Sequence, residues 1–430
     1  MQYLGETEWM SLESLEALQA GLLRRLIRHA AAHTTYYKRV LEQAGMTPED
    51  FRTVADLGRL PLLERDVARE TVDERTSDAP PFAVVKKGTS GTMGRPMVLS
   101  YNAESRFWRE ATKWRGYGWA GYTPGMKSLH FWGFAANPPA NRFAKYKVKV
   151  DRALKREVYF DCTPRGDEYL ADVVAAIREF RPEVLICYAQ AGAALARYIN
   201  RMGARDWGTI QVITGAERLW AHDRVAMEQA FGPELYETYG CREFMLMASE
   251  CNAHDGLHTS MENLIVEIIV REPDGSIRAA RPGETGEVAI TDLHNLANPF
   301  IRYLNGDLAM AMAPGQCECG RSLARIASVE GRVTETLRDA NGNAVSGLIF
   351  NVMFGDLAAY ARQFQVVQHR DGRLTLKVVT MDGAPIAAAG RAKIEGYIGK
   401  YMPGVPLAIE TVADIEPTKA GKRQVVVVEK

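Results

Sequence analysis

The hydrophobic positions at the start of the chain repeat at helical spacing. Four leucines recur three or four residues apart, at Leu15, Leu18, Leu22 and Leu26. We therefore expect residues 1–45 to form amphipathic helices that pack on a larger body. From about residue 101 to residue 240, helical patterns such as 167–180 alternate with short apolar runs such as 184–187 and 210–214. This alternation predicts layered α/β structure.

The pattern changes again in the second half of the chain. Residues 264–293 contain strand-like runs separated by the turn sequences Pro-Asp-Gly and Pro-Gly, which indicates an antiparallel, β-rich subdomain. After Gly331 the chain starts a new series. Two helices, near 347–360 and 386–401, alternate with a hairpin around 371–372 and a strand from 406, so a small α+β domain is predicted.

These patterns together predict an α/β protein with two domains. We expect a large N-terminal domain of several subdomains at 1–331 and a small C-terminal α+β domain at 336–430, connected by residues 332–335. A chain of 430 residues is too long for one ordinary core, which agrees with this division.

The composition of the chain limits the kinds of molecule that it is expected to bind. Lys plus Arg and Asp plus Glu both total 53, so no overall charge attracts the chain to nucleic acid or to an anionic membrane. The start of the chain has no targeting pattern, and no apolar run is long enough to span a bilayer, which predicts a cytoplasmic protein. Six cysteines are too few for a disulfide scaffold. A small-molecule partner is the expectation, and a homodimer stays open.

A loop rich in glycine and hydroxyl residues follows a short predicted strand at 82–86. Residues 87–96 contain three glycines and three Ser or Thr residues. Glycines allow backbone N–H groups to approach phosphate oxygens closely. The loop lacks the Gly-Lys-Ser/Thr ending of a P-loop and the Gly-x-Gly-x-x-Gly of a dinucleotide fold. It is therefore either a phosphate loop of another kind or a flexible surface loop.

Four motifs in order resemble those of the adenylate-forming enzymes. They are Thr89-Ser-Gly-Thr-Met-Gly-Arg-Pro, Tyr239-Gly-Cys-Arg-Glu243, Arg302-Tyr-Leu-Asn-Gly-Asp307 and Pro417-Thr-Lys-Ala-Gly-Lys422. Met93 replaces the usual second threonine of the first motif. The segment Ala55–Pro61 and the run Cys317-Glu-Cys-Gly-Arg321 resemble the phenylacetate–CoA ligase branch, whereas residues 339–346 look more like its capsule-biosynthesis relatives.

The resemblance implies a role for each motif residue. Phosphate and nucleotide binding falls to Thr89, Ser90, Gly91, Thr92, Gly94, Ala216, Glu217, Glu237, Tyr239, Gly240, Asp307 and Arg332. Glu243 is implied as the Mg²⁺ ligand, and Lys422 as the lysine that swings in with the small domain during adenylation. The resemblance also implies a hinge at 332–335 that makes the small domain mobile. The hinge sequence departs from the usual Gly-Arg-x-Asp, so Thr334 and Glu335 are both candidate pivots.

The chemistry of these residues suits the implied reaction. When a carboxylate attacks the α-phosphorus of ATP, charge builds on crowded phosphate oxygens and cations must meet it. Glu243 offers the hard oxygen that Mg²⁺ prefers, and the Asp307 carboxylate can accept hydrogen bonds from a vicinal diol such as ribose. The alternatives are ordinary ones: a solvated Glu243 in a helix-prone stretch, a turn Asp307, a core Tyr239 and a frayed tail at Lys422.

Two further groups of residues extend the predicted site. Cys251, His258, Cys317 and Cys319 are four N/S ligands of the kind tetrahedral zinc takes, and relatives carry a similar arrangement, so we expect a closed structural Zn²⁺ site. His254 is a competing ligand, and a free reduced cluster is the alternative. An aromatic or apolar acid is expected to contact Phe131, Trp132, Phe134, Tyr188 and Met245, each of which could equally be core.

The resulting prediction is an ATP-dependent acid–CoA ligase. Acid and ATP give acyl-AMP and pyrophosphate, and coenzyme A then takes the acyl group. One alternative transfers the acyl group to an amine, a hydroxyl or a carrier-protein thiol in polysaccharide or natural-product biosynthesis. A second alternative is a non-catalytic nucleotide-binding regulatory protein.

Overall fold

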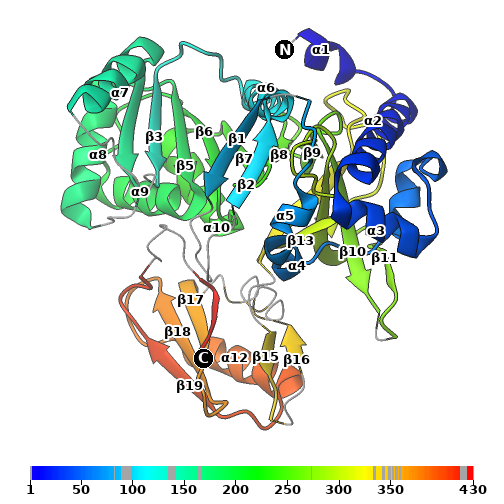
Figure 1. The fold of residues 1–430 in the computed structure, drawn as a ribbon. Coiled ribbons are helices and arrows are strands. Elements are labelled where there is room, and N and C mark those ends of the chain that lie inside the picture. Colours follow the sequence, from blue (N-terminus) through cyan, green and yellow to red (C-terminus); the bar gives the residue numbers. More distant parts are fainter. Residues whose placement is uncertain are drawn as a thin grey trace. The chain divides into compact units, whose positions relative to one another are not determined.

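The protein divides into two compact units in a computed structural model. It describes residues 2–81, 83–88, 98–133, 142–162, 166–272, 274–332, 336–340, 344–346, 350, 353, 357, 360–416 and 424–429. The larger unit comprises Met1–Asn305 with Ala309–Val329, and the smaller comprises Gly306–Leu308 with Glu330–Lys430 (Figure 1). The predicted hinge stays a prediction, because 333–335 lie outside the described residues.

The predicted N-terminal helices are confirmed. They are α1 (Gln2–Thr7), α2 (Leu12–His33) and α3 (Thr35–Ala44). Ser11 caps α2 by accepting a hydrogen bond from the N–H of Ser14, and α3 ends at Gly45, whose φ of 61° suits glycine. Leu15 and Leu26 are fully buried. The helical leucine repeat therefore faces the body of the larger unit.

One sheet runs through the larger unit. Among the described residues, this sheet contains twelve strands in the order β11-β10-β12-β13-β14-β9-β8-β7-β6-β5-β3-β4. The parallel part contains β3 (Ser128–Trp132), β4 (Glu157–Asp161), β5 (Val184–Tyr188), β6 (Gln211–Gly215) and β7 (Leu235–Cys241). The antiparallel part contains β8 (Met245–Glu250), β9 (Leu257–Thr259), β10 (Leu264–Arg271), β11 (Ile277–Ala279), β12 (Thr285–Asp292), β13 (Tyr303–Ala311) and β14 (Arg325–Arg332).

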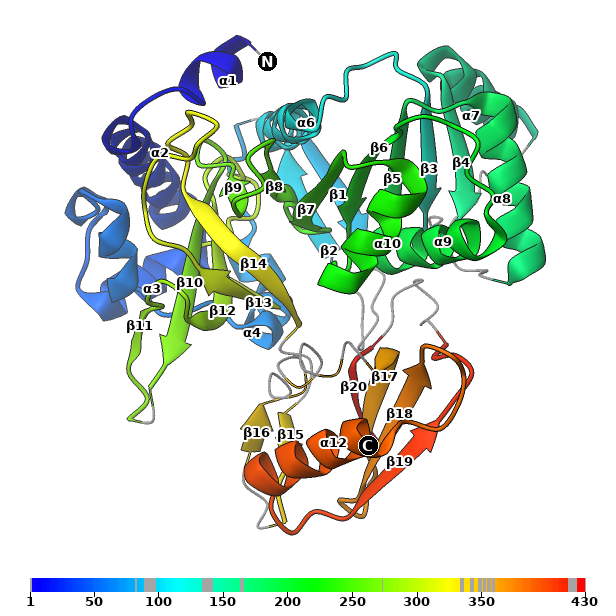
Figure 2. The ribbon, with the colours of Figure 1, turned by 180° about the vertical axis from the view of Figure 1, so that it is seen from behind.

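Helices and short elements complete the larger unit. They are α4 (Arg65–Glu70), α5 (Val72–Arg75), α6 (Ala103–Trp119), α7 (Arg142–Lys155), α8 (Asp167–Phe180), α9 (Ala189–Met202), α10 (Ala221–Phe231), the 3₁₀ turns η1 (Pro48–Asp50) and η2 (Val54–Arg59), and the pair β1 (Val84–Gly88) and β2 (Val98–Asn102). Helices α9 and α10 pack together beside the parallel strands (Figure 2). The α/β prediction and the β-rich stretch at 264–293 are both confirmed.

The order in which the chain adds parallel strands to the sheet reverses at β3. From β3 the chain adds β4 on one side and then crosses over to add β5 on the other. Ligands in open α/β sheets bind beyond the carboxyl ends of the strands at such a switch point. Trp132 ends β3 and Tyr188 ends β5. The topology therefore indicates a binding region that begins at these two residues.

The smaller unit is α+β, as its pattern predicts. Its sheet has the order β19-β18-β17-β20, built from β17 (Ala361–Gln368), β18 (Leu374–Thr380), β19 (Leu407–Thr411) and β20 (Val426–Val428). It also contains α12 (Ala388–Tyr401) and the pair β15 (Thr336–Arg338) and β16 (Ala344–Ser346). Most of the predicted helix at 347–360 lies outside the described residues. Within the described part of the chain, no helix has the length and apolarity needed to cross a bilayer.

Burial of His130 in β3 makes stability depend on pH. Burial, with smaller contributions from Arg152 and Lys113, lowers the pKa of His130 from 6.5 to about 4. Between these values the unfolded chain binds a proton that the folded chain does not, so stability falls as the pH falls from 6.5 towards 4, by at most about 1.4 kcal/mol per pH unit. Urea denaturation at several pH values should show a shallower fall for His130→Gln than for the wild type. Parallel curves would contradict this assignment.

Candidate functional site

Aromatic side chains gather at the switch point. The rings of Trp132 and Tyr188 lie 4.5 Å apart at 82°, in an edge-to-face contact. Trp132 is half-buried, and burial raises the pKa of Tyr188 to about 12. Phe131, one position earlier, points to the other face of β3 and is fully buried in the core. Of the predicted acid-binding residues in β3 and β5, Trp132 and Tyr188 therefore stand at the carboxyl ends, and Phe131 packs in the core.

The turn after β6 is strained at a predicted nucleotide residue. Ala216 has a φ of 68°, a left-handed conformation that a residue with a Cβ rarely adopts. Glu217 follows, and its Oε2 accepts a hydrogen bond from the N–H of Gln190 at the start of α9 (3.1 Å). Strain of this kind persists where surrounding contacts impose it and clusters at functional sites. The turn is thus held by α9 beside the carboxyl end of β5.

The Tyr239–Glu243 motif forms a β-hairpin, so the helix-prone reading of this stretch is wrong. Tyr239 and Gly240 lie in β7, and Glu243 lies in the turn before β8. A Cβ at Gly240 would come within 2.3 Å of the carbonyl oxygen of Met245, so only glycine fits there. Met245 itself has a φ of 59°. The close approach of the two strands overrides the helical preference of the sequence.

Several motif side chains are fixed by hydrogen bonds. The Tyr239 hydroxyl accepts from Asn305 Nδ2 at 2.8 Å, and the Tyr239 ring is 5% exposed within the core. The backbone N–H of Glu237 donates to Glu250 Oε2 at 2.6 Å. Thr238 Oγ1 donates to the carbonyl oxygen of Thr214 at 2.6 Å, which ties β7 to β6. These bonds align the carboxyl ends of neighbouring strands.

Arg109 of α6 clamps the backbone of the Glu243 turn. Its guanidinium donates from Nη1 to the carbonyl oxygen of Glu243 and from Nη2 to Asp292 Oδ2 at 2.6 Å. Both charged side chains are at most 3% exposed. Nε donates to Ser105 Oγ, and the cation lies 4.7 Å from the Tyr101 ring centre. Arg109 was not among the residues predicted from sequence, because an arginine on an amphipathic helix has no distinguishing pattern.

The Glu243 carboxylate is buried and available. Glu243 is 7% exposed, and its side chain makes no hydrogen bond or ion pair with another described residue. Burying an unpaired carboxylate is costly, and a cation removes the cost. The turn therefore presents a hard oxygen ligand whose main chain cannot move freely, which fits a divalent cation.

Part of the third motif, which runs from Arg302 to Asp307, holds the fold together. Arg302, with a φ of 52°, pairs with Glu267 at 3.0 Å and donates from Nη1 to the carbonyl oxygen of Leu60. Leu63 and Tyr303 form a parallel bridge beside it. Arg302 thus joins the Ala55–Pro61 segment to β13. Asp307 lies in β13, is 7% exposed and belongs to the smaller unit.

Other predicted residues lie at the limits of the described chain. Arg332 is the last residue of β14. The residues outside the described ranges are Thr89, Ser90, Gly91, Thr92, Gly94, Phe134 and Lys422. Their roles stay predictions.

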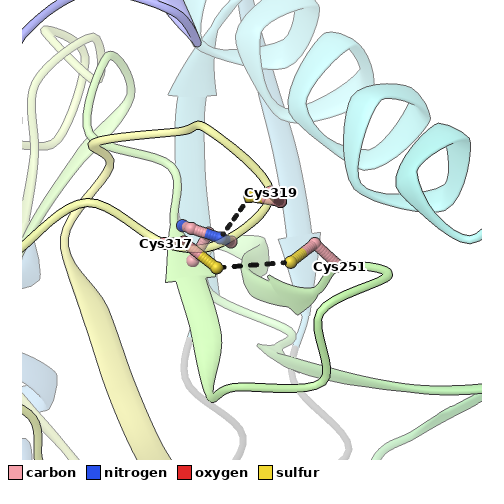
Figure 3. Close-up of side chains that lie close together, drawn as sticks. Cys251, Cys317 and Cys319 are labelled. Atoms are coloured by element: carbon pink, nitrogen blue, oxygen red, sulfur yellow. Dashed lines mark hydrogen bonds between the residues drawn. The ribbon is translucent and has the colours of Figure 1, made fainter.

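The four predicted metal ligands come together. The ligand atoms of Cys251, His258, Cys317 and Cys319 all lie within 4.8 Å of one another (Figure 3). The sulfurs of Cys251 and Cys317 are 3.8 Å apart, and Cys319 Sγ is 3.4 Å from His258 Nε2. Ligands about 2.0 to 2.3 Å from a tetrahedral ion are separated by about 3.4 to 3.8 Å. The cluster has the spacing of a four-ligand metal site.

The surroundings of the cluster select one histidine nitrogen. Nδ1 of His258 faces the carbonyl oxygen of Leu323 at 3.3 Å, which leaves Nε2 for a metal. Burial lowers the pKa of His258 to about 4, so its ring is neutral at pH 7. His254, the competing candidate, points its Nδ1 at Glu250 Oε1 (3.0 Å) and is not in the cluster. His258, and not His254, is therefore the histidine that completes the Cys–His cluster.

Arg321 connects the metal cluster to the first helix. Its guanidinium lies between the rings of Trp9 and Trp119, 4.5 and 4.9 Å from their centres. It also pairs with Glu8 at 3.1 Å, and Glu8 accepts a hydrogen bond from Trp119 Nε1 at 2.6 Å. The residue after the Cys-x-Cys-Gly turn thus fixes the end of α1.

Comparisons with known proteins show which proteins the whole chain is similar to. No family model matches the chain. The phenylacetate–coenzyme A ligase of Thermus thermophilus is 26% identical over 388 residues, which cover 87% of this chain and 82% of the relative. The Escherichia coli phenylacetate–coenzyme A ligase is 27% identical and matches 78% of this chain and 75% of the relative. The chain is thus similar to phenylacetate–coenzyme A ligases over most of its length.

The fold also agrees with a solved structure. A 2-hydroxyisobutyryl-CoA ligase in the postadenylation state, in complex with 2-HIB-AMP, aligns with a TM-score of 0.73 over 99% of this chain and 92% of that chain. At 18% identity the likeness establishes the shared fold. The resemblance stated from the four sequence motifs is confirmed.

The buried pair predicts a large loss of stability on mutation. Arg109→Gln leaves Asp292 buried without its partner, which should cost on the order of 3–5 kcal/mol of unfolding free energy. Arg28→Gln removes an exposed pair with Glu49 and should cost less than about 1 kcal/mol. Urea denaturation of both variants measures the difference. Equal losses would show that the Arg109 clamp contributes nothing special.

Proposed function

We propose that this protein uses ATP to activate a carboxylic acid as its acyl-AMP, releases pyrophosphate, and then forms a coenzyme A thioester. The observation that carries the proposal is the Glu243 turn. It presents a buried carboxylate that has no hydrogen-bond or ion-pair partner among the described residues, on a clamped hairpin, in a chain that aligns along most of its length with phenylacetate–coenzyme A ligases.

The first half reaction builds negative charge on the phosphate oxygens, and positively charged groups must stabilise it. Glu243 would hold Mg²⁺, which when bound supplies positive charge to the phosphate oxygens. The Asp307 carboxylate would accept hydrogen bonds from the ribose hydroxyls, with Arg332 reaching the same sugar. Lys422 would donate to the carboxylate and the α-phosphate oxygens as the acyl–phosphate bond forms and pyrophosphate leaves. The loop at 89–94 would cradle the phosphates.

The acid is proposed to be aromatic or apolar. Trp132 and Tyr188 meet edge to face at the switch point, where a flat acyl group can contact ring faces and edges. Met245, half-buried at the start of β8, adds a polarizable side chain. Phe131 is buried in the core on the other face of β3, so it is not proposed to contact the acid.

Coenzyme A is the proposed acceptor because the curated relatives are coenzyme A ligases. Its thiol would attack the acyl carbon and AMP would leave. An amine, a hydroxyl or a carrier-protein thiol in place of coenzyme A is the alternative within the same first half reaction. Rotation of the smaller unit about residues 332–335 between the half reactions is part of the proposal.

The Cys–His cluster is proposed to hold a structural Zn²⁺ ion. Three thiol groups and one imidazole are a donor set that zinc takes, and the Cys251–Cys317 and Cys319–His258 spacings suit tetrahedral ligation. All four positions would be filled by protein. The ion would therefore stabilise the β8–β9 region and the 317–321 turn without entering the chemistry.

Acid-dependent exchange of pyrophosphate into ATP tests the first half reaction. Across a panel of aromatic and aliphatic acids, the wild type should exchange with at least one acid, and Lys422→Ala should lose exchange by about 100-fold or more. Lys400→Ala, on α12, is the control and should keep it. Absence of exchange with every acid would favour the nucleotide-binding regulatory protein, and exchange without coenzyme A consumption would favour another acceptor.

Metal analysis tests the cluster separately. Protein purified without chelator should contain about one zinc per chain. His258→Ala should lose the metal, whereas His254→Ala should retain it because His254 bonds to Glu250. Cys317→Ser should lose it and Cys187→Ser, buried elsewhere, should not. Less than half an equivalent of zinc in the wild type would reject the site.

A further inference from the structure

Helix α7 carries a row of exposed apolar side chains. Phe143, Tyr146, Val150 and Leu154 are 77%, 66%, 38% and 79% exposed. They follow one another at intervals of three and four residues, so they share one face of the helix. We call this row the α7 stripe. Scattered exposed apolar residues are ordinary on a surface, but a continuous stripe along a helix marks an interaction site.

The stripe faces away from the protein. Among the α7 side chains whose burial is described, Val148 and Arg152 are half-buried, and the Arg152 guanidinium lies 4.0 Å from the ring centre of Tyr159 in β4. At about 100° per residue, these two positions lie opposite the stripe. Figures 1 and 2 show α7 at the outer edge of the larger unit, beside β3 and β4. The usual amphipathic arrangement, with the apolar face against the body, is therefore reversed.

The charges beside the stripe identify what covers it. The α7 sequence RFAKYKVKVDRALK has six Lys or Arg residues and one Asp, a net charge of +5. Exposed Lys147 and Lys149 lie on either side of the stripe. A second copy of this helix would bring like charges together. An anionic lipid surface instead accepts the apolar side chains between its acyl chains, while the lysine stems extend to the headgroups.

We propose that the α7 stripe binds the surface of an anionic membrane, with the helix lying in the plane of the interface. Phe143, Tyr146, Val150 and Leu154 enter the boundary between headgroups and acyl chains, and the flanking lysines contact lipid phosphates. The protein is then a peripheral, reversible membrane binder. The inference does not depend on the proposed ligase activity.

Vesicle sedimentation of the full chain tests this proposal. Vesicles of phosphatidylcholine with about one-third phosphatidylserine should bind the wild type about 10-fold or more tightly than pure phosphatidylcholine, and salt should weaken the binding. Phe143→Glu with Leu154→Glu should lower binding about 10-fold or more. The control Met202→Glu changes a singly exposed methionine of α9 and should have no effect.

Charge variants separate the two contributions. Lys147→Glu with Lys149→Glu should abolish the preference for anionic vesicles, whereas Lys38→Glu with Lys400→Glu, elsewhere on the chain, should keep it. Equal binding to the two vesicle types, or equal binding by stripe and control variants, overturns the proposal. So does a dimer in light scattering that Leu154→Glu dissociates, since the stripe would then be covered by a second copy.

Discussion

The buried Arg109–Asp292 pair is the contact on which the site geometry depends. Arg109 comes from α6, Asp292 ends β12, and the guanidinium also holds the carbonyl oxygen of Glu243. The other carboxylate oxygen of Asp292 accepts from the N–H groups of His294 and Asn295. One ion pair thus fixes a helix, a hairpin turn and a strand end together. Removing one partner of such a pair would leave a buried charge uncompensated, so the three elements depend on both residues.

Backbone conformation, together with the Arg109–Asp292 pair, positions the residues of the predicted site. Gly240 permits the close contact between β7 and β8, and the left-handed residues Ala216 and Met245 lie at predicted site positions. Left-handed backbone at a non-glycine residue costs on the order of 1–3 kcal/mol, and surrounding packing has to impose it. Two of the six left-handed non-glycine residues among the described ones, Ala216 and Met245, therefore lie where a nucleotide and an acid are proposed to bind.

Sequence predicted the fold class, the similarity to phenylacetate–coenzyme A ligases and the grouping of the three cysteines with His258, because each leaves a local trace. Periodicity marks helices such as α8, and the Cys-x-Cys turn limits where its ligands can be. The hairpin at Glu243 was missed because tertiary pairing overrode a helix-prone sequence. Arg109 was missed because its partners are 134 and 183 residues away. The likeness to capsule-biosynthesis relatives, the oligomeric state and the residues at 89–94 and Lys422 stay predictions.

Exposed apolar side chains are treated differently near the first helix and on α7. Trp9 is 54% exposed, yet Arg321 covers one face of its ring and ties α1 to the metal cluster. The α7 stripe has no such cation over it among the described residues, and its own lysines point to its sides. Because apolar surface next to water costs free energy in proportion to its area, a stripe of four side chains needs a cover from outside the chain. The charge of α7 makes that cover anionic.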